Sequence, residues 1–305
     1  MKPEPRITVI GSINMDLVVR CDSLPREGET VMANSVSEIC GGKGANQAVA
    51  AARAGGSVTM IGRVGDDAFA ERLVGNLAAH GVICNRIPTT KNCASGMAVV
   101  AVNRLGQNSI MVVPGANARV TTADILAARD VIAASNILLL QLEIPLDTVL
   151  AAIRIARDAQ VRVILDPAPA VHLWPEELLQ VDLLCPNESE AATLSGATVG
   201  NLEDAAHAAG LLHERGARNV ALTLGEHGTM FCNGRDTTLI EPFSVSTVDT
   251  TAAGDAFAGA LAVCWSETND LRQAVRFANA AGALAASRLG AQPSMPTRTD
   301  ILALL

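Results

Sequence analysis

Short apolar segments alternate with Ala-rich helical segments along most of the chain, and this alternation most constrains its fold. The segments typical of buried strands are 7–10 (ITVI), 58–61 (VTMI), 137–142 (ILLLQL), 161–165 (VRVIL), 182–186 (DLLCP) and 219–224 (NVALTL). Between them, apolar residues spaced by three or four predict amphipathic helices at 44–55, 68–81, 146–159 and 202–216. The alternation predicts an α/β fold, with a doubly wound, mostly parallel sheet flanked by helices.

Two segments interrupt this alternation. Residues 15–39 and 95–113 are typical of hairpin-forming strands, and the second has turn-forming residues at 106–108 between two apolar runs. We predict that both belong to a small β-sheet lid, the alternative being two ordinary edge hairpins. The remaining residues, 1–14, 40–94 and 114–305, then form the α/β domain.

Composition narrows the class of protein. A length of 305 residues suits one large domain with at most a small appendage. A net charge of −8 without a basic run disfavours nucleic acid as a partner. Seven cysteines are scattered without a Cys-x-x-Cys pair, which indicates neither a zinc site nor a disulfide framework. With no signal peptide and no apolar run of ~20 residues, we expect a cytoplasmic protein without a membrane segment.

The stretch TVDTTAAGDAFAGAL, residues 247–261, places an acid at the start of a predicted helix. Small residues precede Asp255, so an anion could approach the unpaired N–H groups of the first turn. A carboxylate beside a bound anion could take a proton from an attacking hydroxyl, as phosphoryl transfer requires. The alternative is that Asp255 only caps the helix.

Five other motifs fall at predicted strand ends or helix starts. They are GSINMD (11–16), CGGKGANQ (40–47), LQLEIP (140–145), CPNESE (185–190) and LTLGEHG (222–228). Each has a structural alternative, such as an Asx turn, a Gly-rich turn or a helix cap. Because ligands bind at the carboxyl ends of parallel strands, we expect all six motifs to line one crevice.

The motifs GGKGANQAVAAARAG and DTTAAGDAFAGAL resemble those of the ribokinase-like carbohydrate kinase family. The similarity runs almost end to end, and GSINMD, LQLE, DPAPA, PNESE and GAQPSMP are closest to the members that act on ribose. The resemblance implies a doubly wound α/β domain with a β-sheet lid, and a homodimer built through that lid. It also implies ATP-dependent phosphorylation of the terminal 5-hydroxyl of D-ribose, giving ribose 5-phosphate.

The resemblance also implies the roles of individual residues. Asp255 would be the general base, and the N–H groups of Ala252, Ala253 and Gly254 would form the anion hole. The sugar would be held by Asn14, Asp16, Gly42, Lys43, Asn46, Glu143 and Asp255. The ATP site would be lined by Asn187, Thr223, Leu224, Gly225, Glu226, His227, Gly228, Gly254 and Asn279. Relatives often have His at position 279. Glu190, with Asn187, would act through Mg²⁺ and its waters. An activating K⁺ would lie at Asp249, Thr251, Ala285, Arg288, Gly290 and Ser294, several of them through backbone carbonyls; position 251 is often aliphatic in relatives.

The choice of sugar is the least constrained expectation. Neither lid segment contains an aromatic residue, and aliphatic residues such as Met15, Val99, Val100 and Met111 stand there instead. Family members that take nucleosides usually clamp the base between aromatic rings, so a small sugar is expected. Kinases of 2-deoxyribose or of another small sugar remain alternatives, as does a non-catalytic sugar-binding regulator. Replacement of Asp255 by Asn is expected to lower kcat and leave the fold and sugar affinity nearly intact.

Overall fold

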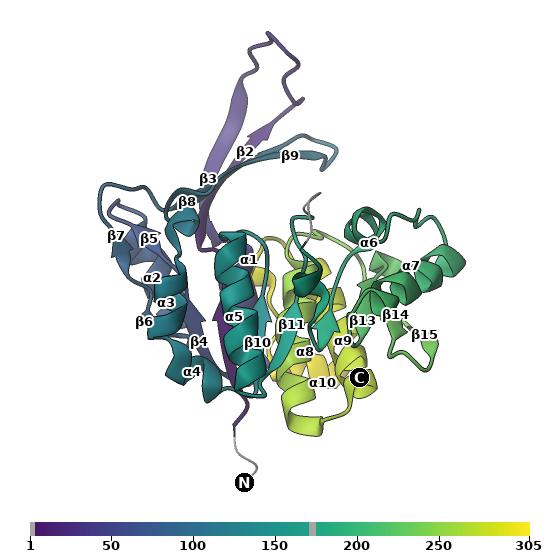
Figure 1. The fold of residues 1–305 in the computed structure, drawn as a ribbon. Coiled ribbons are helices and arrows are strands. Elements are labelled where there is room, and N and C mark those ends of the chain that lie inside the picture. Colours follow the sequence, from purple (N-terminus) through teal and green to yellow (C-terminus); the bar gives the residue numbers. More distant parts are fainter. Residues whose placement is uncertain (1–3, 171–174) are drawn as a thin grey trace.

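The computed structural model describes residues 4–170 and 175–305, so residues 1–3 and 171–174 of the predicted α/β domain lie outside it. Within these ranges a large sheet is flanked by helices, and a smaller sheet projects from one end (Figure 1). The strand order of the large sheet is β15 (Thr237–Ile240), β14 (Thr229–Cys232), β13 (Val220–Thr223), β12 (Leu183–Leu184), β11 (Arg162–Leu165), β10 (Ile137–Leu140), β1 (Arg6–Ile10), β4 (Ser57–Ile61) and β6 (Ile83–Arg86).

The pairing of these strands confirms the predicted fold class. The strands from β6 to β13 pair in parallel, and only β14 and β15 add antiparallel pairs at one edge. Strand β1 lies inside the sheet, between β10 and β4, so the chain winds outward from it in both directions. The sheet is therefore doubly wound and mostly parallel.

Helices cover both faces of the large sheet because alternate side chains of its strands point to opposite sides. On one face, Ile7 and Val9 join a core with α1 (Lys43–Arg53), α2 (Ala70–Ala79), α8 (Ala253–Thr268), α9 (Leu271–Ala286) and α10 (Arg298–Leu304). On the other face, Ile10 and Leu138 join a core with α3 (Thr122–Ala127), α4 (Arg129–Ala133), α5 (Leu146–Asp158), α6 (Glu188–Ser195) and α7 (Leu202–Glu214). The two cores hold the strand ends in fixed positions relative to the helix starts.

The segments 15–39 and 95–113 contribute most of the smaller sheet. Its order is β3 (Ala33–Gly41), β2 (Asn14–Cys21), β8 (Gly96–Val102) and β9 (Asn108–Val113). Strand β2 leads directly from the end of β1, so the small sheet extends above the carboxyl ends of the large sheet (Figure 1). A separate two-stranded sheet pairs β5 (Val64–Gly65) with β7 (Thr89–Thr90).

The register of the small sheet shows which side chains share a face. Asp16 pairs with Ala98, which pairs with Val112, so these side chains lie on one face together with Val100 and Ile110. Met15, Val99 and Met111 alternate with them and therefore lie on the opposite face. Of the four aliphatic residues expected near the sugar, only Val100 shares the face of Asp16.

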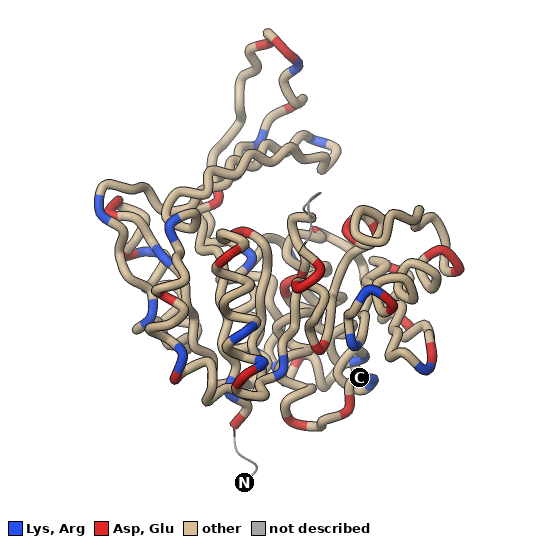
Figure 2. Tube along the Cα trace, in the orientation of Figure 1, with Lys and Arg blue, Asp and Glu red and all other residues tan. Residues whose placement is uncertain are grey.

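Basic and acidic residues are intermixed over the part of the molecule that the structure describes. Figure 2 shows Lys and Arg interspersed with Asp and Glu along the outer helices and the small sheet. In the part of the chain that the structure describes, no helix is long and apolar enough to cross a membrane. All seven cysteines are free.

Candidate active site

Acidic side chains from distant segments meet at the carboxyl-end edge of the large sheet. Glu143 and Asp166 follow β10 and β11, and the parallel pairing of these strands brings their ends to the same edge. Helices α1 and α8 pack together there, with Lys43 at the first position of α1 and Asp255 in the first turn of α8. The site therefore combines one ammonium group with several carboxylates.

Asp255 does not cap its own helix. Its carboxylate instead accepts hydrogen bonds from the side chains of α1, with Asn46 Nδ2 at 2.9 Å from Oδ2 and Gln47 Nε2 at 3.1 Å from Oδ1. Burial raises the pKa of Asp255, while Lys43 and the two amide donors lower it. Both carboxylate oxygens retain a lone pair, so the group can still accept a proton from a ligand.

The backbone that precedes Asp255 has a conformation that lets an anion approach its N–H groups closely. Ala252 adopts a left-handed conformation with φ of 61°, which turns the chain into α8. The N–H of Ala253 donates to the Thr250 carbonyl at 3.2 Å, whereas the N–H groups of Ala252 and Gly254 have no acceptor within residues 4–170 and 175–305. Gly254 is exposed and has open space beside it. The N–H of Asp255 also has no acceptor in the described part of the chain, so unpaired N–H groups stand at the positive end of the α8 dipole.

The predicted sugar ligands line the junction between the two sheets. Asn14 accepts a hydrogen bond from Asn117, and Glu143 accepts hydrogen bonds from the Ser12 hydroxyl and from the Lys43 N–H. Burial, reinforced by Glu143 and Asp255, raises the pKa of Asp16 to about 7, and its Oδ1 is buried without a partner. An unpartnered buried carboxylate oxygen is costly, so this atom is ready to accept a ligand hydroxyl.

Glycines let α1 begin directly against the end of β1. Gly42 has φ of 90°, and a Cβ there would lie 2.7 Å from the backbone nitrogen of Asn14. A Cβ on Gly44 would lie 2.7 Å from the backbone of Gly11. The glycines of the CGGKGANQ motif therefore allow the close packing that brings Lys43 and Asn46 to the strand ends.

Lys43 is the basic group at the centre of these acids. Its Nζ lies 4.0 Å from Asp166 Oδ2. Although burial lowers the pKa of Lys43, Asp166, Asp255 and Glu143 together hold it above its usual value. The lysine therefore remains charged and partly balances the carboxylates around it.

Of the predicted ATP-lining residues, Asn187 and residues 223–228 lie at the ends of β12 and β13. Asn187 and Glu190 form a reciprocal capping box at the start of α6, so the structural alternative for these two residues is realised. Burial raises the pKa of Glu190, and Asp255 raises it further. Thr223 ends β13, and residues 224–228 form a tight turn around the 3₁₀ helix Gly225–His227, closed by the Leu224 N–H donating to the Gly228 carbonyl at 2.8 Å.

Asn279 is held by its neighbours through both ends of its amide. Its Oδ1 accepts from the Thr229 hydroxyl at 2.6 Å, and its Nδ2 donates to the carbonyls of Ile240 and Glu241. These bonds tie α9 to β14 and β15. Asn279 therefore has a structural role, because its amide joins these elements at the edge of the predicted ATP site.

The residues predicted to hold a monovalent cation lie on two loops that meet. Asp249 accepts hydrogen bonds from the N–H of Thr251 and of Gly290, each at 2.9 Å. The Ala285 carbonyl accepts from the Arg288 N–H, and Ser294 bonds to Ala291 within a 3₁₀ turn at 292–294. Asp249 thus connects the turn before α8 with the loop at 287–294.

Four buried polar residues of the site had no role assigned from sequence. Gln47 and Gln141 are fully buried, Gln292 is almost fully buried and Asp166 is 8% exposed. Gln292 Nε2 donates to Asn46 Oδ1 at 3.1 Å. Gln47 donates to Asp166 and accepts a hydrogen bond from Gln141. Asp166 directly follows a buried strand, and Glu143 nearly does. An acid at the end of a buried strand is the sequence feature from which Asp166 could have been predicted as a site residue.

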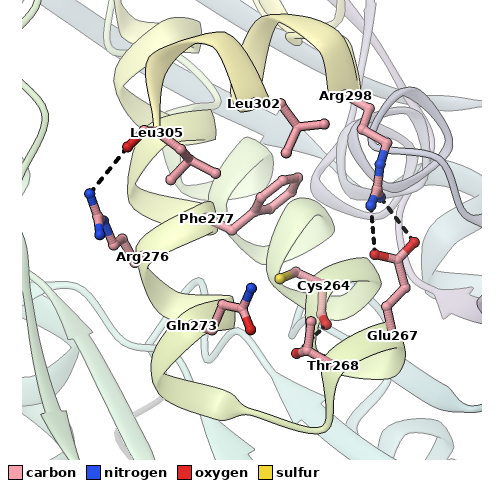
Figure 3. Close-up of a pocket in the computed structure, with 9 residues that line it drawn as sticks. All are labelled: Cys264, Glu267, Thr268, Gln273, Arg276, Phe277, Arg298, Leu302 and Leu305. Atoms are coloured by element: carbon pink, nitrogen blue, oxygen red, sulfur yellow. Dashed lines mark hydrogen bonds and ion pairs between the residues drawn. The ribbon is translucent and has the colours of Figure 1, made fainter.

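Two cavities elsewhere on the molecule contain none of the predicted site residues. One of about 270 Å³ lies between the far ends of α8, α9 and α10, where Arg298 pairs with Glu267 (Figure 3). Because a helix rises 1.5 Å per residue, Cys264 in this cavity is about 14 Å along α8 from Asp255. The other, of about 540 Å³, borders Arg162 at the amino end of β11.

Comparison with known proteins gives matches over nearly the whole chain. A ribokinase of Bacillus subtilis (strain 168) is 41% identical over 299 residues, which cover 98% of this chain and 99% of the relative. A deoxyribokinase of Salmonella typhi is 36% identical over 292 residues, or 95% of each chain. The structure of an Arabidopsis thaliana ribokinase complexed with ribose and ATP is similar with a TM-score of 0.89 and 34% identity, over 99% of each chain.

The family model described as pfkB family carbohydrate kinase matches residues 4–298, which include the strand ends, α1 and the start of α8. The convergence of Lys43, Asp255 and the unpaired N–H groups at this edge agrees with that match. This chain belongs to the pfkB family of carbohydrate kinases, and it is an ATP-dependent sugar kinase.

Proposed function

We propose that this protein transfers the terminal phosphoryl group of ATP to the 5-hydroxyl of D-ribose, giving ribose 5-phosphate and ADP. The observation that carries the proposal is the Asp255 carboxylate, which two amides hold beside unpaired N–H groups at the start of α8. The relatives described as ribokinases, and the neighbour complexed with ribose and ATP, support ribose as the sugar.

In the proposed mechanism Asp255 is the general base. As the 5-oxygen of the sugar bonds to the γ-phosphorus, its proton passes to the Asp255 carboxylate and the bond to the ADP oxygen breaks. The N–H groups around Ala252, Ala253 and Gly254 stabilise the charge on the transferred group. The free N–H groups of Ala252 and Gly254 support this role, and Ala253 contributes after its bond to Thr250 is released.

The sugar is proposed to lie between the two sheets. Asn14, Asp16, Gly42, Lys43, Asn46 and Glu143 would hold its hydroxyls. The unpartnered oxygen of Asp16 supports this placement, because a sugar hydroxyl would supply the missing hydrogen bond. A site that hydrogen-bonds a hydroxyl can reject the analogue that lacks it by orders of magnitude.

ATP is proposed to lie across the ends of β12 and β13. Asn187, Glu190, the turn at 223–228, Gly254 and the neighbourhood of Asn279 would line it. Glu190 suits a magnesium ion held through water, because its carboxylate accepts one backbone hydrogen bond from Asn187 and keeps lone pairs that a bound water could reach. When bound, Mg²⁺ supplies positive charge that neutralises the phosphates during transfer.

A monovalent activator is proposed at the two loops that Asp249 connects. Backbone carbonyls at Thr251, Ala285, Arg288 and Gly290, with Ser294, are oxygen donors of the kind that K⁺ accepts. When bound, K⁺ supplies a fixed charge between the loops. The chain's own residues then hold the turn that presents the N–H groups of 252–254.

The small sheet is proposed to act as a lid and as the contact of a homodimer. Exposed apolar side chains cover much of it, including Val36, Met111 and Val113, each at least half exposed. Exposed apolar surface of this kind usually marks an interface. Because the reaction uses ATP and the seven cysteines are free thiols, we place the enzyme in the cytoplasm.

The proposal is tested by measuring kcat/KM for D-ribose, 2-deoxyribose and fructose with ATP. We expect the highest value for ribose. A higher value for 2-deoxyribose, the sugar named by a relative 36% identical to this chain, would reassign the substrate and leave the kinase assignment in place. Sugar binding without any ATP turnover would instead favour a regulator.

A further inference from the structure

Gln47 connects two buried carboxylates of the site. It lies in α1, directly after Asn46, and it is fully buried. Its Nε2 lies 2.7 Å from Asp166 Oδ2 and 3.1 Å from Asp255 Oδ1. An amide nitrogen carries two hydrogens, so one Gln47 side chain can donate to both acids at the same time.

A second glutamine determines which end of the Gln47 amide faces the acids. Ionised carboxylates only accept hydrogen bonds, so Gln47 must present its nitrogen to them and its oxygen to the other side. There Gln141 Nε2 donates to Gln47 Oε1. Gly11 leaves the space for Gln141, since a Cβ at Gly11 would lie 1.9 Å from Gln141 Oε1.

The other oxygen of Asp255 is held by the same type of arrangement. Asn46 donates to Asp255 Oδ2, and Gln292 donates to the oxygen of the Asn46 amide. Each oxygen of the carboxylate therefore receives an amide donor, and a second amide orients that donor. This pairing restrains rotation of the carboxylate about its side-chain bonds.

We propose that Gln47, oriented by Gln141, is a positioning residue that holds the Asp255 carboxylate ionised and aimed at the sugar hydroxyl. The inference rests on the proposed phosphoryl transfer, in which Asp255 is the base. Gln47 is separated from solvent, and its donor groups are committed to the two acids, so it acts through Asp255 rather than on the sugar.

The charges around Asp255 explain why the donor matters. Those that influence it from the neighbouring elements are Lys43 on α1, Glu143 after β10, Asp166 after β11, Asp16 on β2 and Glu190 on α6. Burial raises the pKa of Asp166 to about 7, with Lys43 acting in the opposite direction. Without the shared donor, the buried carboxylates of Asp166 and Asp255 would lose the group that separates them, and protonation of Asp255 would become easier.

The test replaces Gln47 by Met, which keeps the length of the side chain and removes both donors. We expect kcat to fall by about 10- to 100-fold. We also expect the acidic limb of the kcat profile to move upward by about one pH unit, with less than about a threefold change in the KM for sugar. The matched control is Thr268→Val, which removes a side-chain hydrogen bond to the Cys264 carbonyl at the end of α8 opposite Asp255. A purely structural effect would lower the stability of both variants and leave both pH profiles in place.

A second variant and a second readout keep the test decisive. Gln141→Met leaves the Gln47 donors but removes the bond that orients them, and we expect a smaller shift in the same direction. The carboxyl carbon resonance of Asp255, assigned by its loss in Asp255→Asn, should titrate at higher pH in both variants. Wild-type kcat with an unmoved acidic limb and an unmoved resonance would overturn the positioning role. Absence of ribose phosphorylation by the wild type would refute the proposed function alone, because the resonance needs no turnover.

Discussion

Asp255 lies in the first turn of α8, yet its carboxylate accepts hydrogen bonds from another helix, α1. Both of its oxygens accept amide donors from α1, and the acid makes no cap hydrogen bond to the α8 backbone. The capping alternative for this residue therefore does not apply. Because Asn46 and Gln47 donate to this carboxylate, a substitution of Asp255 should also affect the stability of the fold.

We expect Asp255→Asn to lower kcat by at least about 10²-fold, because the proposed general base is lost. The sequence alone predicts an almost unperturbed fold, but an amide at 255 would place its NH₂ group against the donor nitrogen of Asn46 or Gln47. Two facing donors leave buried groups unsatisfied, so unfolding should become easier by about 1–3 kcal/mol. Steady-state kinetics and urea unfolding measure both effects. Retention of more than about a tenth of kcat would exclude the base role.

Asp16 should make the unliganded protein less stable at high pH. Its pKa, raised by burial to about 7, lies above the value of 3.8 for the unfolded chain. Between these values the folded state binds a proton that the unfolded state lacks, so stability should fall as the pH rises from 5 to 8.

We expect Asp16→Asn to remove much of this dependence. The variant should be more stable than the wild type by about 2 kcal/mol at pH 8 and similar to it at pH 5, while its KM for sugar rises. Urea unfolding at pH 5, 6.5 and 8 measures this. The control is Asp130→Asn, because the Asp130 side chain is 74% exposed. Parallel curves for wild type and Asp16→Asn would contradict the assignment.

At the scale of elements, the start of α8 and the loop at 287–294 are joined through Asp249. We expect K⁺ to raise kcat and to change the KM for sugar little, because the cation would act through the turn that presents the N–H groups of 252–254. Titration with KCl at an ionic strength held constant by choline chloride measures the effect. Asp249→Ala should abolish the response, and a flat profile for the wild type would show that the cation site is wrong.

At the scale of the whole molecule, the small sheet has more apolar surface than one chain covers. Val36 is 64% exposed and lies on the face opposite Asp16, as does Met111. We expect a two-fold dimer through this sheet at micromolar concentration. Val36→Asp should shift sedimentation toward the monomer and raise the KM for sugar together. Leu126→Asp on α3, at a residue 61% exposed, is the matched control. A fully active wild-type monomer would remove the dimer.

The local pattern of apolar residues was sufficient to predict the main strands and helices of this protein. Buried strands and amphipathic helices differ in hydrophobic period, so the strands at 7–10 and 58–61 and the helix at 146–159 could be predicted nearly to their ends. Short strands were less well bounded: the segment 182–186 contributes only Leu183–Leu184 to the sheet. The parallel order then brought the predicted motifs at the strand ends to one edge.

The sequence by itself determined the fold class and the presence of polar motifs at strand ends, because period and turn chemistry are local properties. Only the tertiary structure decided which polar groups pair. Gln47 and Asp166 lie 119 positions apart in the chain, and no spacing rule relates them. Likewise, the face of the small sheet on which Met111 lies depends on strand register, and a one-residue shift would move this side chain to the other face. Contacts between distant segments depend on packing of the whole chain, so they are absent from any local pattern.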